Sequence, residues 1–278
     1  MGELLQLHQR LEEGQVHLWH SYVQKFDGIA TASSMALLTL KERSLYQHFI
    51  FEKDKRRYLL TRVLIRTILS KYLPIEPQNL IFENNKYGRP YIANNDPRAR
   101  LLHFNISHTD SIIFIAVTTR RELGIDVENT NRSTPFEVSD NFFSRQELNA
   151  LSSLPMKAKS NRFWELWTLK ESYTKARGIG LSLPLNQFSF HFQDDYFASI
   201  NFDAGFDDRS DRWLFLLLKP DAENIVAICI EKICAGMLTF VSYEITPLQA
   251  MSNVKYRFLR GSENYENEFK KNDDAILK

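Results

Sequence analysis

The sequence predicts a mixed α+β fold, because segments with the periodicity of strands and of helices alternate along the chain. In QVHLWHSYV (residues 15–23), apolar and polar residues roughly alternate, as in a strand. In the basic segment from Ser34 to Leu73, apolar residues instead recur every three or four positions, as on one face of a helix. With 278 residues, the chain can bury one large core or two smaller ones.

The remaining elements follow from the same signals. The prolines of KYLPIEP end the first long helix, and Gly88 and Pro90 predict a turn that leads into a strand. HFNISHT, SIIFIAVTT and GIDVE are predicted strands, and SDNFFSRQELNAL is a predicted helix. A further helix is expected over roughly Ser160 to Ala176, with a stop at Gly178. Strand-like pieces follow at 188–192, 213–218, 225–230 and 238–243.

The composition excludes several classes of protein. The chain is 44% hydrophobic and 25% charged with a formal net charge of +1, so it lacks the cationic excess of a nucleic-acid binder. Cys229 and Cys234 match no common zinc pattern and make no disulfide framework. The longest apolar run, WLFLLL, is too short to cross a bilayer, and the N-terminus is not a secretory signal. We therefore expect a cytoplasmic protein that acts on neither nucleic acid nor membrane.

The predicted strand GIDVE (residues 124–128) carries two carboxylates on one face. Asp126 and Glu128 are two residues apart, whereas Ile125 and Val127 point to the other face. Such a pair of oxygen ligands suits a hard cation such as Mg²⁺. A half-buried strand with two solvated acids has the same pattern, so this motif alone leaves metal binding open.

The segment FWELWTLKESYTKARG (residues 163–178) predicts a helix with two different faces. The expected core face carries Leu166, Leu169, Tyr173 and Ala176, and the opposite face carries Trp164, Trp167, Thr168, Glu171 and Lys175. Glu171 and Lys175 would make an i,i+4 ion pair worth only about 0.2–0.5 kcal/mol in solvent. Because two tryptophans are costly to leave in water, we expect this face to line a cleft or to be covered by another lobe.

Three further cations are candidates for binding phosphate. Arg57 lies on the basic helix, Arg89 in the turn YGRP, and His108 in NISH. Guanidinium and imidazolium groups at such positions are natural phosphate ligands. Taken singly, each of them is better explained by a solvated surface charge or, for the histidine, by a side chain satisfied within the core.

Together these segments resemble the 4′-phosphopantetheinyl transferases, in the larger two-lobed Sfp-type class. The resemblance is carried by FNISH, GIDVE, FFSRQE and FWELWTLKESYTKARGIGLSLPL. The last is the most specific, because W-x-x-K-E-x-x-x-K followed by G-x-G-L-S-x-P is long and unusual. EKDKRRYLLTRVLIRTIL and YGRP also resemble N-terminal segments of the family, so the resemblance covers roughly residues 15 to 245.

The resemblance implies two similar α/β lobes, related by a pseudo-two-fold axis, with the active site in the cleft between them. Residues 1–122 would form the N-terminal lobe, and residues 123–250 the C-terminal lobe with the metal site. Residues 251–278 are polar, and we expect this tail to be loosely ordered. This class is usually monomeric, so we expect a monomer.

The resemblance also implies the reaction. The protein would transfer 4′-phosphopantetheine from coenzyme A to a serine of an apo acyl or peptidyl carrier protein, as a holo-acyl-carrier-protein synthase does, and release 3′,5′-ADP. Asp126, Glu128 and Glu171 match the acids that bind Mg²⁺. Glu171 would be the general base, directly or through water, and Lys175 would stabilise the transition state. Matches to the contacts of the coenzyme's phosphates are Arg57, Arg89, Ser107 and His108, although many relatives carry Lys in place of Arg89.

Two other functions stay open on sequence grounds. One is a coenzyme A- or nucleotide-binding module without catalysis, which would not need the complete set of base and metal ligands. The other is a magnesium-dependent phosphohydrolase, which would release product without an acceptor protein. The sequence does not identify the carrier or its pathway, whether fatty-acid, polyketide or peptide synthesis. Carrier proteins are typically acidic, so a basic or apolar docking surface is expected, with residues 129–136 as a candidate.

Overall fold

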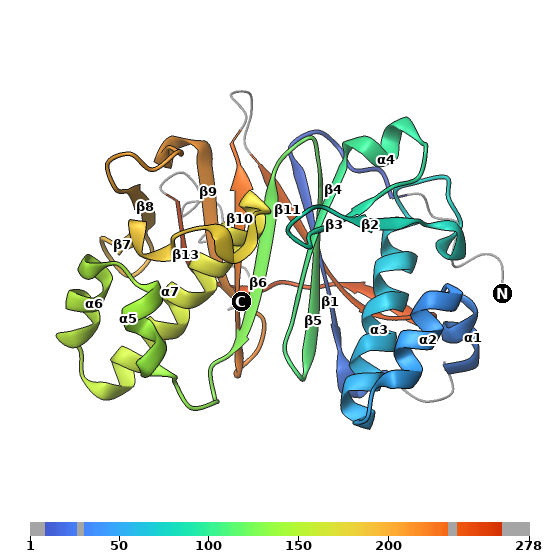
Figure 1. Cartoon of the computed structure of the whole chain (residues 1–278), viewed down its shortest axis with the longest axis horizontal. Coiled ribbons are helices and arrows are strands. Elements are labelled where there is room, and N and C mark those ends of the chain that lie inside the picture. The colour runs from blue at the N-terminus through green and yellow to red at the C-terminus, as the bar shows by residue number, and fades with distance from the viewer. Residues whose placement is uncertain (1–8, 27–30, 233–237, 263–278) are drawn as a thin grey trace, which may run out of the picture. The chain divides into compact units, whose positions relative to one another are not determined.

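The computed structural model describes residues 9–26, 31–232 and 238–262 (Figure 1). It confirms the predicted α+β class, because helices and several sheets are distributed along the chain. Cys234 and most of the predicted polar tail lie outside the described residues. None of the helices within the described ranges is long and apolar enough to span a bilayer.

The chain forms two compact units. The N-terminal unit consists of Met1–Arg120 with Gly236–Val254, and the C-terminal unit of Arg121–Ala235 with Lys255–Lys278. The predicted boundary after residue 122 lies close to the start of the second unit. The structure differs from the prediction in the segment 236–254: residues 236–250 were expected in the C-terminal lobe and residues 251–254 in the tail.

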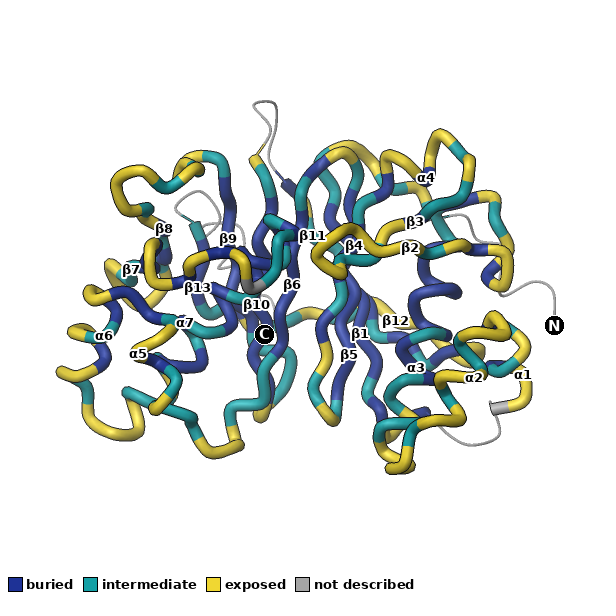
Figure 2. Tube along the Cα trace, in the orientation of Figure 1, coloured by how far each residue is buried: buried dark blue, intermediate teal, exposed yellow. Residues whose placement is uncertain are grey.

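Strands from both ends of the chain build the sheet of the N-terminal unit, in the order β12-β11-β1-β5-β4. They are β1 (Gln15–Tyr22), β4 (Leu102–His108), β5 (Ile112–Thr119), β11 (Thr239–Thr246) and β12 (Ala250–Asn253). β1 is antiparallel to β5 and parallel to β11. Because β1 is central, both of its faces are buried, including the polar positions of the alternating pattern (Figure 2).

The aromatic packing of β11 explains why the segment 236–254 belongs to the N-terminal unit. Tyr243 stacks on Trp19 of β1, with ring centroids 4.2 Å apart, and Ile245 joins the same core. The prediction of a strand at residues 238–243 is therefore confirmed as secondary structure. Its partner β1 lies more than 200 residues earlier, and such a long-range pairing leaves no local signal in the sequence.

The basic segment predicted as helical forms three helices rather than one. They are α1 (Thr31–Ala36), α2 (Leu40–His48) and α3 (Glu52–Leu69). Thr39 starts α2 through a capping box with Glu42, which is why the helices are separate. The apolar stripe of α3 lies in the core of this unit: Leu59, Leu60, Val63, Leu64 and Ile68. The hairpin β2 (Phe82–Asn84) and β3 (Pro90–Ile92) and the short helix α4 (Pro97–Leu101) precede β4.

The sheet of the C-terminal unit is antiparallel, in the order β13-β9-β10-β6. Its strands are β6 (Leu123–Asn129), β9 (Trp213–Lys219), β10 (Asn224–Glu231) and β13 (Arg257–Gly261). A hairpin of β7 (Phe188–Phe192) and β8 (Ala198–Phe202) accompanies it. β13 corrects the expectation of a loose tail for its residues, because the strand pairs with β9 and buries Phe258.

Three helices follow β6: α5 (Ser139–Phe142), α6 (Arg145–Ser152) and α7 (Met156–Arg177). The single helix predicted for SDNFFSRQELNAL is divided, because Ser144 starts α6 in a capping box with Glu147. α7 begins four residues earlier than predicted, at Met156. It ends as predicted at Gly178, whose φ of 64° is left-handed.

The two faces predicted for α7 are only partly separate. The expected core face is buried, as Leu166, Leu169 and Tyr173 show. Trp164 and Thr168, predicted on the opposite face, are also buried, at 1% and 0% exposure. Trp164 belongs to the core of the C-terminal unit itself, so this unit already covers part of the face that we expected a cleft or another lobe to cover. Trp167, Glu171 and Lys175 keep partial exposure.

Candidate active site

The absence of a side chain at Gly124 allows α7 to lie directly against β6. A Cβ atom at this position would overlap the backbone oxygen of Ser172 and the backbone nitrogen of Ala176. Both atoms belong to the last two turns of α7, next to Glu171 and Lys175 in sequence. The close approach therefore brings the carboxylates that follow Gly124 on β6 next to these two side chains.

Asp126 and Lys175 form the central ion pair of this site. Lys175 Nζ lies 2.7 Å from Asp126 Oδ1, and Asp126 is 5% exposed. This ion pair joins α7 to β6, whereas the i,i+4 pair between Lys175 and Glu171 stays a prediction. A half-buried lysine held on a buried carboxylate in this way can approach a ligand phosphate from a fixed position.

Glu128 is held through both of its carboxylate oxygens. Trp167 Nε1 donates a hydrogen bond to Oε1 at 2.9 Å, and Arg132 pairs with Oε2. Burial is the main reason why the pKa of Glu128 is raised to about 7, and the charge of Asp126 raises the pKa further. Arg132, Trp167 and Lys175 act in the opposite direction.

Glu171 shares this environment. Burial raises the pKa of its carboxyl, the charge of Asp126 adds to the rise, and Lys175 opposes it. A carboxylate whose pKa is raised towards neutrality is a better proton acceptor than an ordinary surface glutamate. The predicted base is thus in surroundings that suit its role, and the structure brings it together with Asp126, Glu128 and Lys175.

The donor set of Asp126, Glu128 and Glu171 fits Mg²⁺ in its chemistry. All three offer the carboxylate oxygens that this ion prefers, and the charge of Asp126 raises the pKa of each neighbour, so the acids are close enough to repel. Among the described residues, no three His, Cys, Asp or Glu side chains are grouped so that they could hold a metal alone. Mg²⁺ usually takes one or two carboxylates and completes its shell with water and substrate phosphates. Binding of Mg²⁺ by the three acids therefore stays a prediction, and it fits a site in which substrate phosphates supply some of the ligands of the ion.

Lys170, which precedes the base, has a structural role that the sequence did not reveal. It is 1% exposed, and its Nζ donates hydrogen bonds to the backbone oxygens of Leu185 and Phe188, each at 2.7 Å. It also pairs with Glu147 of the FFSRQE motif at 2.8 Å. Glu147 in turn accepts a hydrogen bond from the backbone N–H of Phe190. This buried pair joins α6 and α7 to β7, and so fixes the rotation of α7.

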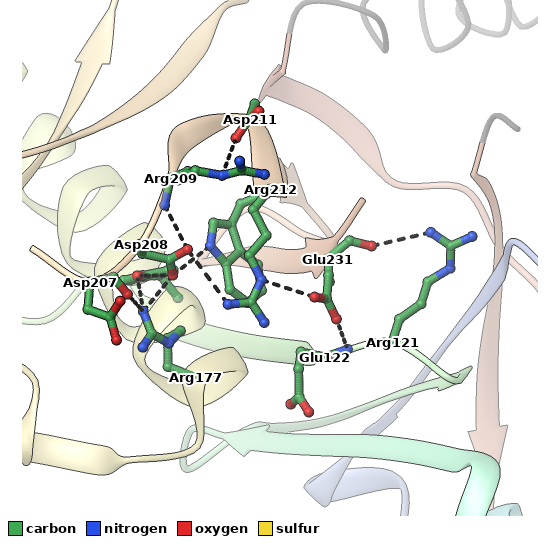
Figure 3. A network of polar contacts seen from close by, with 11 residues as sticks. Arg121, Glu122, Arg177, Asp207, Asp208, Arg209, Asp211, Arg212 and Glu231 are labelled. Carbon is green, nitrogen blue, oxygen red and sulfur yellow. Dashed lines mark hydrogen bonds and ion pairs between the residues drawn. The ribbon is translucent and has the colours of Figure 1, made fainter. Parts of the chain in front are cut away.

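A polar network holds the C-terminal end of α7 (Figure 3). Its centre is Asp208, whose side chain is 1% exposed. Asp208 Oδ2 accepts hydrogen bonds from Tyr173 Oη at 2.7 Å, from Trp213 Nε1 at 2.9 Å and from Arg177. Arg212 extends the network to Glu231 at the end of β10, with a distance of 3.0 Å between Nε and Oε1. The helix is thus anchored to the sheet at the turn that carries Lys175.

Arg57, the first of the predicted phosphate ligands, lines a cavity of about 680 Å³ in the N-terminal unit. Arg57 pairs with Asp54 at 2.7 Å and with Asp110. Lys53 and Arg56 from the same turn of α3 also line the cavity, and the sequence did not single them out. The apolar part of the wall comes from Val23, Phe26, Tyr46 and Leu59.

The other predicted phosphate ligands lie elsewhere in the N-terminal unit. Arg89 is at the turn between β2 and β3, and Ser107 and His108 end β4. Ser107 is 7% exposed, whereas His108 is exposed. Of the four described candidates, only Arg57 lines the cavity. The prediction that all four bind the coenzyme's phosphates is not tested by these positions.

Comparison with known proteins identifies the family. A family model described as 4′-phosphopantetheinyl transferase superfamily matches residues 122–229, and one described as 4′-phosphopantetheinyl transferase, N-terminal, matches residues 19–120. A 4′-phosphopantetheinyl transferase of Bacillus subtilis is 35% identical over 171 residues, which cover 62% of this chain and 74% of the relative. The chain belongs to the 4′-phosphopantetheinyl transferase superfamily.

Two further relatives confirm the resemblance to the Sfp-type class. 4′-Phosphopantetheinyl transferase Sfp of Bacillus subtilis (strain 168) is 32% identical over 60% of this chain and 71% of its own length. 4′-Phosphopantetheinyl transferase HetI of Nostoc sp. (strain PCC 7120) is 29% identical over 78% of this chain and 87% of its own. The two family models meet between residues 120 and 122, where the C-terminal unit begins.

Proposed function

We propose that the protein transfers the 4′-phosphopantetheine group of coenzyme A to a serine hydroxyl of an apo carrier protein, and releases 3′,5′-ADP. The observation that carries this proposal is the cluster of Asp126, Glu128, Glu171 and Lys175 between β6 and α7. Membership of the 4′-phosphopantetheinyl transferase superfamily supports it. As in a holo-acyl-carrier-protein synthase, an acyl carrier protein would be one acceptor, and a peptidyl carrier protein another.

The residues of the cluster would share the chemistry as follows. The serine oxygen forms a new bond to the phosphorus of phosphopantetheine, and the bond from that phosphorus to the oxygen of 3′,5′-ADP breaks. Glu171 would accept the serine proton, because burial raises the pKa of its carboxyl and so makes it a stronger base. Lys175 would offset the negative charge that gathers on the pyrophosphate oxygens. Mg²⁺ bound by Asp126, Glu128 and Glu171 would supply further neutralising charge.

The cavity beside Arg57 supports binding of the coenzyme by the N-terminal unit. Lys53, Arg56 and Arg57 supply cations for phosphate, and apolar and aromatic side chains form another part of the wall. Glu52 and Asp110 also line the cavity, and Asp110 pairs with Lys53 and Arg57, so a phosphate would have to replace it as their partner. Cations beside an aromatic wall suit a ligand that carries phosphate next to an aromatic ring, as the nucleotide end of coenzyme A does. Arg89, Ser107 and His108 remain proposed contacts to its phosphates.

The non-catalytic coenzyme-binding module is not favoured, because the relatives carry the name of the transferase and the proposed base and metal ligands are all present. The assay that separates the three functions measures release of 3′,5′-ADP from coenzyme A, with and without an apo carrier protein. The proposal predicts release only with the carrier. Release without a carrier would point to a phosphohydrolase, and no release with several carriers to a binding module.

A further inference from the structure

The loop after β6 places a second cation at the acidic cluster, in addition to Lys175. Arg132 lies in this loop, four residues beyond Glu128, and pairs with Glu128 Oε2. Its guanidinium carbon lies 4.4 Å from the centre of the Trp164 ring, in a cation–π contact. Neither the predicted mechanism nor the family resemblance assigned a role to this arginine.

The two partners of Glu128 differ in how firmly they are held. Trp167 belongs to α7 and packs against Phe163 and Phe142, with ring centroids 6.1 and 5.4 Å apart. Arg132 belongs to an irregular loop, and its side chain is 54% exposed. Release of Trp167 would disturb an aromatic cluster, whereas release of Arg132 returns a guanidinium to water. A ligand that needs an oxygen of Glu128 would therefore displace Arg132.

We infer that Arg132 is a displaceable counter-ion of Glu128, which leaves this carboxylate when a divalent cation binds to it. The inference rests on the proposed Mg²⁺ site and makes Arg132 a positioning residue rather than a catalytic one. Arg132 offsets the repulsion between Glu128 and Asp126, and it competes with the metal for the same oxygen. The competition weakens binding of the metal alone, and so favours its binding together with the pyrophosphate of the coenzyme.

The direct test is the dissociation constant of Mg²⁺, measured calorimetrically on the full chain and on Arg132→Gln. The measurement is made at about pH 8.5, above the pKa of about 7 of Glu128, and at low salt, where the charge interactions are little screened. Loss of a partly exposed ion pair should tighten metal binding by about 2- to 5-fold. Arg132→Lys keeps the charge and should stay close to the original protein. The matched control is Arg209→Gln, an 80% exposed arginine of the same unit, which should change nothing.

Tryptophan fluorescence gives a second test, which uses the original protein and so does not depend on whether a variant folds. If the metal displaces Arg132 from the Trp164 ring, addition of Mg²⁺ should change the tryptophan emission of the original protein. The dissociation constant obtained from this change should equal the one measured by calorimetry. An unchanged emission during metal binding would overturn the inference, and so would equal or weaker binding by Arg132→Gln. A lack of Mg²⁺ binding in the original protein would instead overturn the proposed metal site, which is a different result.

Discussion

Substitution of Gly124 by alanine tests whether the packing of α7 on β6 sets the geometry of the site. The added methyl group would overlap backbone atoms of Ser172 and Ala176, which cannot move without the helix. To regain an ordinary separation of 3.4 Å or more, α7 must shift by about 1 Å or more. Such a shift would lengthen the 2.7 Å pair of Asp126 and Lys175. A displacement of about 1 Å in an active site can cost about 10²-fold in rate.

The expected result for Gly124→Ala is a loss of about 10²-fold in the rate of pantetheine transfer, with a cost of about 1–3 kcal/mol in the free energy of unfolding. Both are measured on the same preparation, by initial rates with a saturating carrier and by denaturant unfolding. Ile228→Val in β10 is the control, because Ile228 is buried but lies outside the core cluster that contains α7. It should cost about 0.5–1.5 kcal/mol and leave the rate unchanged. Normal turnover in a folded Gly124→Ala protein would refute the reasoning.

Three further predictions concern single side chains. Glu171→Gln should slow transfer by about 10²–10⁴-fold, as expected for loss of a general base, and a normal rate would remove Glu171 from that role. Asp208→Asn should lower the free energy of unfolding by about 2–3 kcal/mol in denaturant titrations, because Arg177 loses a buried carboxylate. The control is Asp211→Asn, because the side chain of Asp211 is 72% exposed. Equal losses of stability in the two variants would contradict the account. Burial lowers the pKa of His17 to about 4. As the pH falls, His17 is therefore protonated near pH 6.5 in the unfolded chain but only near pH 4 in the folded protein. Stability should therefore fall by at most about 3 kcal/mol as the pH drops from 7 to 4, and His17→Gln should flatten this fall, whereas parallel pH profiles would show that His17 titrates normally.

Local patterns predicted the residues of the acidic cluster. Period-two alternation in GIDVE placed Asp126 and Glu128 on one face of a strand, and helical periodicity placed Glu171 beside Lys175. The role of Gly124 could not be predicted in this way, because it depends on backbone atoms of a helix almost 50 residues later. The ion pair of Lys175 with Asp126 depends on the same packing, so the i,i+4 rule, which concerns α7 alone, could not predict it.

Long-range pairing also explains the differences in the fold. β11 completes the sheet of the N-terminal unit, although the intervening chain builds the C-terminal unit. Trp164 lies on the helix face opposite the expected core face and is nevertheless buried in the core of its own unit. The division of α5 from α6, in contrast, has a local signal in the sequence, since Ser144 and Glu147 have the spacing of a capping box.

The most direct test of the central claim is the intact mass of an apo acyl carrier protein after incubation with this protein, coenzyme A and Mg²⁺. The account predicts a gain of one phosphopantetheine group, which is lost when Mg²⁺ is chelated and is strongly slowed in Glu171→Gln. An unchanged carrier mass with both acyl and peptidyl carriers would contradict the proposed function. A gain that persists at full rate in Glu171→Gln would instead show that the cluster between β6 and α7 is not the catalytic centre.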